Sequence, residues 1–343
     1  MSRIGVRRSV NRRRAVPAFC ASALVVFLAN SLASEAAAQA EPGPSLDGVV
    51  QVTAHVPSDA RTASSLGTRR DGTGVVIDGN GLILTIGYLI LEASEVEISG
   101  VAPEPVPARV VAYDHETGFG LLRTAQPLDV APIPLGASAE VDRRQPMMVV
   151  SRAGEFDAAG VYVVDRRDFA GYWEYLLEDA IFTAPPHPQF GGAALINRDG
   201  RLVGIGSLFV NDAVIHGRPI PGNMFVPIDH LKPIMADLLT RGRRTDPGRP
   251  WLGLTLEEHQ GRVFVRRVSP EGPAAAAGLQ PSDLILGIGG IQVDGLADFY
   301  RKLWSRGEAG VDVPLDVLQG MAVGSVVVKS GDRYRYLHLN PTY

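Results

Sequence analysis

The chain has 343 residues, of which 45% are hydrophobic and 20% are charged, and its formal net charge at pH 7 is −4. This length is sufficient for two domains with ordinary hydrophobic cores. The acidic balance argues against nucleic acid as a partner, because phosphate backbones are bound by lysine and arginine. The sequence contains no basic cluster with interleaved aromatic residues, so we expect no nucleic-acid binding.

The first forty residues, 1–40, have the pattern of a secretory signal peptide. Arginines crowd the start, the apolar stretch AFCASALVVFLANSLA follows, and AAAQA supplies small residues before a predicted cleavage after Ala40. We therefore expect a periplasmic or secreted protein with no membrane span after cleavage. A membrane anchor is the alternative, but the apolar run is short and is interrupted by Asn30 and Ser31. Cys20, the single cysteine, lies in this segment, so the rest of the chain can form no disulfide.

Short strands are predicted for most of the chain that follows. Residues 41–64 show no clear pattern and are predicted to be a flexible N-terminal segment. Between residues 65 and 240, short apolar stretches alternate with Gly, Asn, Asp and Pro, and GVVIDGNGLILTIG indicates two strands around a tight turn. Such spacing without intervening helices indicates a β-barrel or sandwich. The stretch DHLKPIMADLL, residues 229–239, is predicted to be a helix that Asp229 caps.

A linker and a second unit follow. Residues 241–250 lie in the stretch TRGRRTDPGRP, which begins at Thr240. The stretch is charged and contains Gly and Pro, which is typical of a linker. Residues 251–340 are predicted to form a small domain with a helix at 296–306, capped by Asp294. Its predicted strands are WLGLTL, RVFVRRV, LILGIGG with IQV, VPLDVL, SVVVK and RYRYLHL.

The order of motifs resembles that of HtrA/Deg-type serine proteases. The resemblance covers roughly residues 65–340 and implies a mainly β protein, in which a chymotrypsin-like double β-barrel (65–240) precedes a PDZ domain (251–340), a small β-barrel with helices. It also identifies the catalytic segments. LTIGYLIL places Tyr88 at the histidine position, YDHETGFGLLR places Gly118 at the aspartate position, and QFGGAALINRDGRLVGIG places Gly191 at the serine position.

All three triad positions therefore carry residues that cannot do triad chemistry. The mechanism needs a nucleophile, a base with a pKa near neutrality, and a carboxylate that orients the base. Glycine supplies no side chain, and the tyrosine pKa near 10 makes Tyr88 a poor base. Gln189 stands at the oxyanion-hole position, where the family has glycine. We therefore expect a pseudoprotease in which Tyr88 packs into the vacated space, or alternatively contributes to a binding cleft.

A serine endopeptidase with a residual or relocated active site is the alternative from the enzyme class. The candidates nearest to the old motifs are Ser151, Ser207, His115 and His187. No spacing pairs them, so the two histidines are expected to be solvent-facing loop residues. The seven histidines include no HExxH or other paired ligand spacing, so we expect neither a metal nor another cofactor.

The PDZ resemblance is carried by PWLGL and by SPEGPAAAAGLQPSDLI. It implies that Trp251, Leu252, Gly253 and Leu254 form the loop whose backbone N–H groups receive a peptide's C-terminal carboxylate. The expected partners are protein C-termini or extended, unfolded polypeptides. A PDZ fold with an occluded groove is one alternative, and a non-catalytic subunit of an active HtrA-type protease is another. Residues 41–70 contain no Phe, Tyr or Trp for the aromatic contacts of a family trimer, so an oligomer is possible but a trimer is in doubt.

Overall fold

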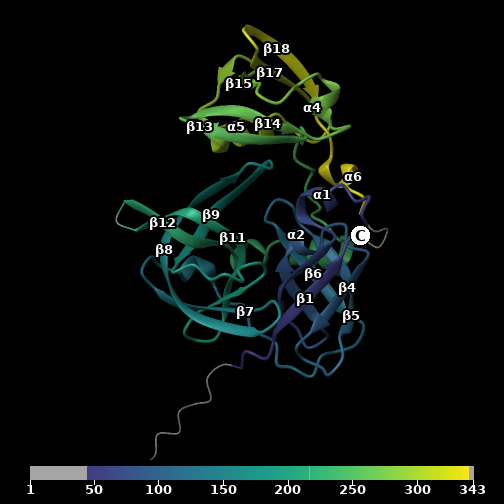
Figure 1. The fold of residues 1–343 in the computed structure, drawn as a ribbon, viewed down its shortest axis with the longest axis vertical. Coiled ribbons are helices and arrows are strands. Elements are labelled where there is room, and N and C mark those ends of the chain that lie inside the picture. The colour runs from purple at the N-terminus through teal and green to yellow at the C-terminus, as the bar shows by residue number, and fades with distance from the viewer. Residues whose placement is uncertain (1–44, 216, 340–343) are drawn as a thin grey trace, which may run out of the picture. The chain divides into compact units, whose positions relative to one another are not determined.

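The strands of the described residues form two closed barrels and a third, smaller sheet (Figure 1). The structure is a computed structural model that describes residues 45–215 and 217–339, and these residues form one compact unit. The predicted signal peptide with Ala40 lies outside the described residues. Within the described ranges, no helix is long and apolar enough to cross a membrane.

The first barrel contains six strands in the order β1-β2-β3-β6-β5-β4. They are β1 (Val49–His55), β2 (Arg69–Val76), β3 (Leu82–Ile86), β4 (Glu95–Ser99), β5 (Val106–Tyr113) and β6 (Phe119–Thr124). The β2–β3 turn forms as predicted, because the Asp78 carboxylate accepts hydrogen bonds from the N–H groups of Asn80 and Leu82. Within the segment predicted to be flexible, 41–64, the prediction is wrong for β1, which pairs with both β2 and β4 and closes the barrel.

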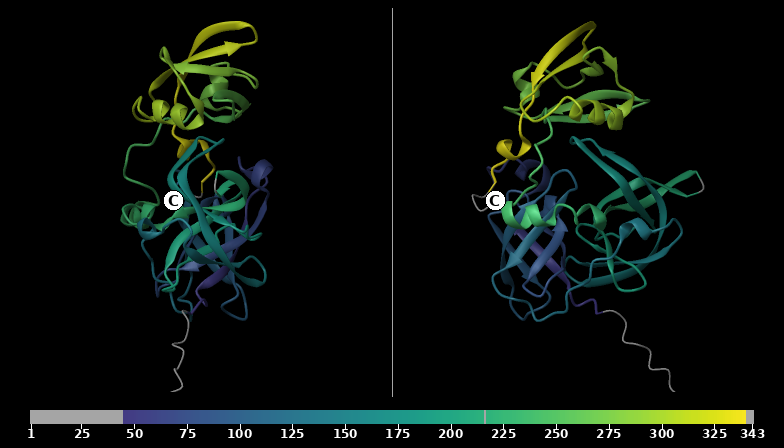
Figure 2. Two further views of the ribbon diagram at one scale, coloured as in Figure 1. Left: turned by 90° about the vertical axis from the view of Figure 1, so that its left-hand side faces the viewer. Right: turned by 180° about the vertical axis from the view of Figure 1, so that it is seen from behind.

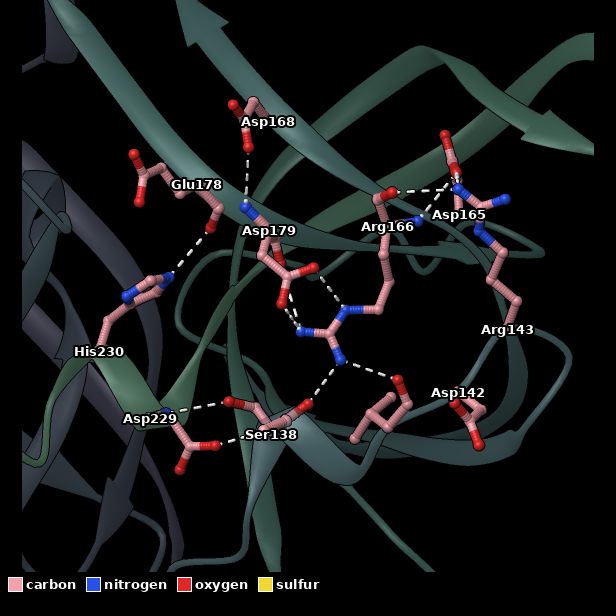
Figure 3. A network of polar contacts seen from close by, with 12 residues as sticks. Ser138, Asp142, Arg143, Asp165, Arg166, Asp168, Glu178, Asp179, Asp229 and His230 are labelled. Atoms are coloured by element: carbon pink, nitrogen blue, oxygen red, sulfur yellow. Dashed lines mark hydrogen bonds and ion pairs between the residues drawn. The ribbon is translucent and has the colours of Figure 1, made fainter.

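The second barrel has the strand order β10-β11-β12-β9-β8-β7. Its strands are β7 (Pro146–Arg152), β8 (Phe156–Gly171), β9 (Tyr175–Ala184), β10 (Ala194–Ile196), β11 (Leu202–Ile215) and β12 (Arg218–Pro227). Strands β8 and β9 run on beyond the barrel as a long hairpin (Figure 2). Arg166 of β8 ties the hairpin to the segment before β7: it pairs with Asp179 of β9 and donates to the carbonyls of Ser138 and Val141 (Figure 3).

Short helices connect these strands: α1 (Ala63–Leu66), α2 (Gly87–Ile90), η1 (Ser138–Glu140), η2 (Ile228–His230) and α3 (Met235–Arg241). The predicted helix at 229–239 is split into η2 and α3. Pro233 explains the split, because a proline disfavours helical backbone in the residue before it. Asp229 caps neither helix; its carboxylate accepts the N–H of Ala139 at 2.8 Å instead (Figure 3).

The third sheet has the order β13-β14-β15-β17-β18, with β16 paired to β15. Its strands are β13 (Leu254–His259), β14 (Arg262–Val268), β15 (Leu284–Ile288), β16 (Ile291–Gln292), β17 (Asp312–Gln319) and β18 (Ala322–Lys329). Helices α4 (Pro273–Ala276) and α5 (Gly295–Trp304) pack on it, and α5 buries an apolar stripe made of Leu296, Phe299, Tyr300 and Leu303.

Two local predictions for this domain are wrong. Asp294 makes no side-chain cap for α5; its N–H donates instead to the carboxylate of Asp298. The stretch RYRYLHL is not a strand but contains helix α6 (Arg333–Tyr336), whose first turn is capped by the Asp332 carboxylate. In both cases short-range hydrogen bonds to carboxylates decide the local backbone.

Candidate functional site

The three triad-equivalent positions lie around one region of the double barrel. Tyr88 is on α2, Gly118 is in the β5–β6 turn, and Gly191 is in the loop between β9 and β10. The N–H of Gly87, next to Tyr88, donates to the carbonyl of Gly118 at 2.6 Å. A β-carbon built on Gly191 would be 3.0 Å from the Tyr88 hydroxyl oxygen. The barrels therefore still present these positions to one another.

Tyr88 fills the space that a serine and a histidine would need. Its hydroxyl donates to the carbonyl of Ser207 at 3.0 Å, and its ring packs on the barrel core. Burial raises the pKa of Tyr88 above its ordinary value, so the phenol stays protonated at neutral pH. The side chain at the histidine position is therefore a hydrogen-bond donor with no capacity to act as a base.

Arg70 holds the α2 turn that carries Tyr88. The guanidinium is buried and donates to the carbonyls of Gly67, Tyr88 and Leu91 and to the hydroxyl of Thr62. Burial lowers the pKa of Arg70. Because the last carbonyls of a helix lack internal partners, these bonds fix where α2 ends and where the tyrosine ring points.

The two glycines of the serine loop differ sharply. Gly192 has φ +76°, and a β-carbon there would lie 1.9 Å from the carbonyl oxygen of Thr73. Gly191 has no such backbone, and the Tyr88 hydroxyl is the nearest atom to its β-carbon position. Glycine is required at 192 by geometry, whereas at 191 the backbone would accept a larger residue.

The side chain of Gln189 is directed at Ser151. Its amide oxygen accepts the Ser151 hydroxyl at 3.0 Å and the N–H of Ala153 at 3.4 Å. The structure thus uses this residue, at the position of an oxyanion-hole glycine, to tie its loop to β7.

Ser151 and His187 are in contact, which the sequence spacing did not predict. The Ser151 Oγ is 2.8 Å from His187 Nε2, and the Asp157 carboxylate lies 3.8 Å from Nδ1. The prediction of a solvent-facing His187 is wrong, because the residue is 2% exposed and its N–H and carbonyl are both bonded to the amide of Asn223. Burial lowers the pKa of His187, which favours the neutral ring.

This arrangement has the residue types of a Ser-His-Asp triad without its accessibility. Ser151 is completely buried, so a substrate carbonyl has no path to its Oγ. A distance of 3.8 Å between Nδ1 and Asp157 is also too long for the hydrogen bond that orients a catalytic imidazole. Among the other candidates, the Ser207 carbonyl accepts the Tyr88 hydroxyl, and the His115 ring packs at a tilt against Tyr334 with 4.2 Å between ring centroids.

The loop that precedes and opens β13 has three backbone N–H groups aimed at one point. Those of Leu252, Gly253 and Leu254 all donate to the carboxylate of Glu174, at 2.9, 2.7 and 2.7 Å. Gly253 has φ +80°, which turns successive N–H groups to the same side and builds an anion-binding nest. Trp251 supports the loop: its N–H donates to Gly331, and its ring packs on Tyr336.

Sequence reasoning missed Glu174 and Asp157. Glu174 lies in WEYLLEDAIFTA, which reads as an ordinary strand, and its partners are about eighty residues further along the chain. The only local signal is the cluster of Tyr172, Trp173 and Tyr175 around it, which is unusual for a hairpin turn. Within the described ranges, no group of acidic, histidine or cysteine side chains is arranged to hold a metal ion.

Comparison with known proteins gives two family matches. Residues 72–205 match the trypsin-like peptidase domain, and residues 250–329 match the PDZ domain. Protease Do-like 1 of Arabidopsis thaliana chloroplasts is 28% identical over 73% of this chain and 61% of its own length. The serine protease Do-like HtrA of Bacillus subtilis is 24% identical, with coverage of 80% and 68%.

A probable periplasmic serine endoprotease DegP-like from Pseudomonas fulva is 24% identical over 81% of the chain and 61% of its own length. The chain thus spans about three fifths of the length of two of these three relatives.

Solved structures match the fold. The serine endoprotease of Yersinia pestis has a TM-score of 0.50 at 21% identity, with 83% of this chain and 94% of that one covered. A variant of the HtrA-type protease AlgW with a tripeptide gives 0.51 at 20% identity, with 84% and 94% covered. The predicted order of a double β-barrel and a PDZ domain is confirmed.

Proposed function

Because this chain is a homologue of HtrA and DegP proteins, with a trypsin-like peptidase domain followed by a PDZ domain, we propose that it is a non-catalytic binding protein. It captures protein C-termini or extended polypeptides through Trp251–Leu254 and acts as an exported quality-control or regulatory factor. Periplasmic DegP-like relatives and the predicted signal peptide support export.

One observation carries the binding function. Three consecutive N–H groups, those of Leu252, Gly253 and Leu254, converge on a carboxylate in this structure. A polypeptide C-terminus presents the same chemical group, and PDZ domains bind it in such a backbone nest. The nest needs no particular side chain, so the substitutions that emptied the triad positions leave it intact.

The proposal of lost catalysis is supported by the geometry at the triad positions. Tyr88 is a protonated phenol, and Gly118 and Gly191 offer no functional group. The Tyr88 hydroxyl also stands within 3.0 Å of the place where a serine β-carbon would be. The double barrel then serves as a scaffold, either alone or as a partner of an active homologous protease.

The binding function is tested with a library of fluorescein-labelled peptides that carry free C-terminal carboxylates, and with the same library amidated. We expect the purified chain to bind a subset of the free acids and none of the amides. The variant Gly253→Val should abolish this binding, because a β-branched residue at φ +80° moves the N–H groups of the loop.

The matched control is Gly320→Val. Gly320 also has a positive φ of 60° in the same domain, but it lies in the β17–β18 turn with open space around its β-carbon position. If both variants lose binding, backbone strain in the domain is responsible and the loop is not the site. Equal binding of free acids and amides would show that the terminal carboxylate is not recognised.

A second candidate, a serine hydrolase at Ser151, is favoured by the 2.8 Å contact with His187 alone. It requires local opening, since both side chains are buried. A fluorophosphonate probe followed by peptide mass spectrometry tests it. Labelling of Ser151 that is lost in His187→Gln would replace the binding proposal with an enzyme, whereas an unlabelled chain leaves the pair as a structural contact.

A further inference from the structure

We propose that the PDZ groove already holds a ligand supplied by the chain itself, the turn of the β8–β9 hairpin with Glu174 as the carboxylate. An external C-terminus must then displace this turn. The inference rests on the proposed peptide-binding function and adds its regulation.

The first argument is the completeness of the carboxylate contact. Glu174 Oε2 accepts the N–H of Leu252, and Oε1 accepts those of Gly253 and Leu254. Glu174 is 6% exposed, so water is largely excluded from the contact. Burial raises the pKa of Glu174, while the three N–H donors favour its ionised form. Hydrogen bonds from several N–H groups to a carboxylate are among the strong ones in proteins. A peptide carboxylate at the same place would need the same three donors.

The second argument is a backbone contact along the sheet edge. Strand β13 is the first strand in its sheet order, and the N–H of Leu256 donates to the carbonyl of Tyr172 at 2.7 Å. A peptide that adds as a strand to an exposed edge uses N–H groups of this kind. The hairpin turn therefore uses both backbone features, the nest and the strand edge, that a bound C-terminus would use.

The third argument is that α5 clamps the same turn. The hydroxyl of Tyr300 donates to the carbonyl of Gly171 at 2.7 Å and accepts the N–H of Glu174 at 3.2 Å. Leu176, two residues beyond the glutamate, is buried within the hydrophobic core of the PDZ domain. An apolar side chain and a carboxylate of the turn thus both contact the PDZ domain. The last residue of a peptide with an apolar C-terminus would present the same two groups.

The turn is also held from outside the groove. Arg301 of α5 forms an ion pair with Asp168 of β8, and Arg333 of α6 donates to the carbonyl of Trp173 at 3.2 Å. Glu174 itself has φ +55°, an uncommon backbone for a residue with a side chain. The contacts on both sides of the turn keep it in this conformation.

Competition by an attached ligand is strong because the ligand never diffuses away. A tethered group acts at an effective concentration on the order of millimolar. The apparent affinity for an external peptide is reduced by the fraction of molecules in which the groove is open. Only peptides that are abundant or that contact the groove more extensively than the turn displace it.

The variant Glu174→Gln tests the inference in the full chain. Glutamine has the same shape, but it is uncharged and its NH₂ group would face N–H donors. We expect the labelled free-acid library to bind at least about tenfold more tightly than to the wild type. Glu178→Gln is the control, because it is an exposed glutamate on the same hairpin. Equal affinity of Glu174→Gln and wild type would overturn the inference.

A second readout needs no external ligand. Hydrogen exchange of the Leu252–Leu254 and Leu256 amides should be at least about tenfold faster in Glu174→Gln, and unchanged in Glu178→Gln. If no peptide binds to any variant, the proposed function fails, and the exchange rates still decide whether the turn occupies the groove. If peptides bind but exchange and affinity do not respond to Glu174→Gln, the function stands and the self-ligand is wrong.

Discussion

The triad region of the double barrel and the carboxylate loop of the PDZ domain are built from different parts of the chain, side chains in the first and backbone in the second. At the triad positions the backbone frame remains, with Gly87 still bonded to Gly118 and Gly192 still in its left-handed conformation. The side chains that would do chemistry are absent there. At the carboxylate loop, the backbone itself is the functional group, and it remains directed at an anion.

The difference shows how two kinds of site respond to substitution. A site made of side chains depends on the identity of its residues, and under the proposed loss of catalysis its space is taken by one aromatic ring, Tyr88. A backbone site tolerates most side-chain changes, provided that its glycine keeps the required φ. Ligand binding at such a site is controlled more simply by occupying it, as Glu174 occupies the loop here, than by replacing its residues.

The largest expected effect concerns the frame of the triad region. Gly192→Ala should lower the free energy of unfolding by about 3 kcal/mol, because the residue is strained at φ +76° and its β-carbon meets the Thr73 carbonyl at 1.9 Å. Gly191→Ala should cost no more than about 1 kcal/mol, since its β-carbon meets only the movable end of Tyr88. Urea unfolding followed by circular dichroism measures both.

The two adjacent glycines control for each other, since the chemical change is the same. Comparable losses would mean that position 191 is as constrained as position 192, and the contrast between lost side chain and retained frame would fail. If Gly192→Ala is harmless, the loop has more freedom than its hydrogen bonds to Thr73 and Gly206 indicate.

Much of the fold follows from the sequence because strands and turns are encoded locally. The Asp78 turn, the barrel strands and the PDZ elements arise from alternation and turn residues over a few positions. The prediction of one helix at 229–239 is wrong because Pro233 interrupts it, although the proline is visible in the sequence. The prediction of a strand at RYRYLHL is wrong because Asp332 caps a helical turn there.

The site is less accessible from sequence because its key contacts are long-range. The motif spacing locates Tyr88, Gly118 and Gly191, and the structure places them around one region. Nothing local links Glu174 to a loop at 252–254. The burial of His187 depends on a β12 residue, Asn223, that is thirty-six positions away.

The next prediction separates a structural from a catalytic role for the Ser151–His187 pair. Burial lowers the pKa of His187 below the ordinary value of 6.5, so near this pH the unfolded chain binds more protons than the folded chain. Stability should therefore fall as the pH drops through 6.5. His187 contributes at most about 1.4 kcal/mol to this loss between pH 7.5 and pH 5.5, the limit for one proton that only the unfolded chain binds.

His187→Gln isolates this contribution from that of His115, whose pKa burial also lowers. The variant should show a shallower loss of stability with acid than the wild type, measured by urea unfolding at both pH values. An identical pH dependence would show that His187 titrates normally when folded. A wild type that becomes more stable than the variant as the pH falls would indicate a raised His187 pKa, as in a carboxylate-paired imidazolium.

The smallest expected effect is that of the hydroxyl which fills the triad region. Tyr88→Phe removes the donor to the Ser207 carbonyl while leaving the ring in place, and should cost about 1 kcal/mol. The same change should leave peptide affinity at the PDZ groove unaltered, because Glu174 and its partners do not contact Tyr88. Unfolding experiments and the labelled peptide library measure the two quantities on one protein. A change in peptide affinity without a change in stability would mean that Tyr88 acts on the groove and that the two regions are coupled rather than independent.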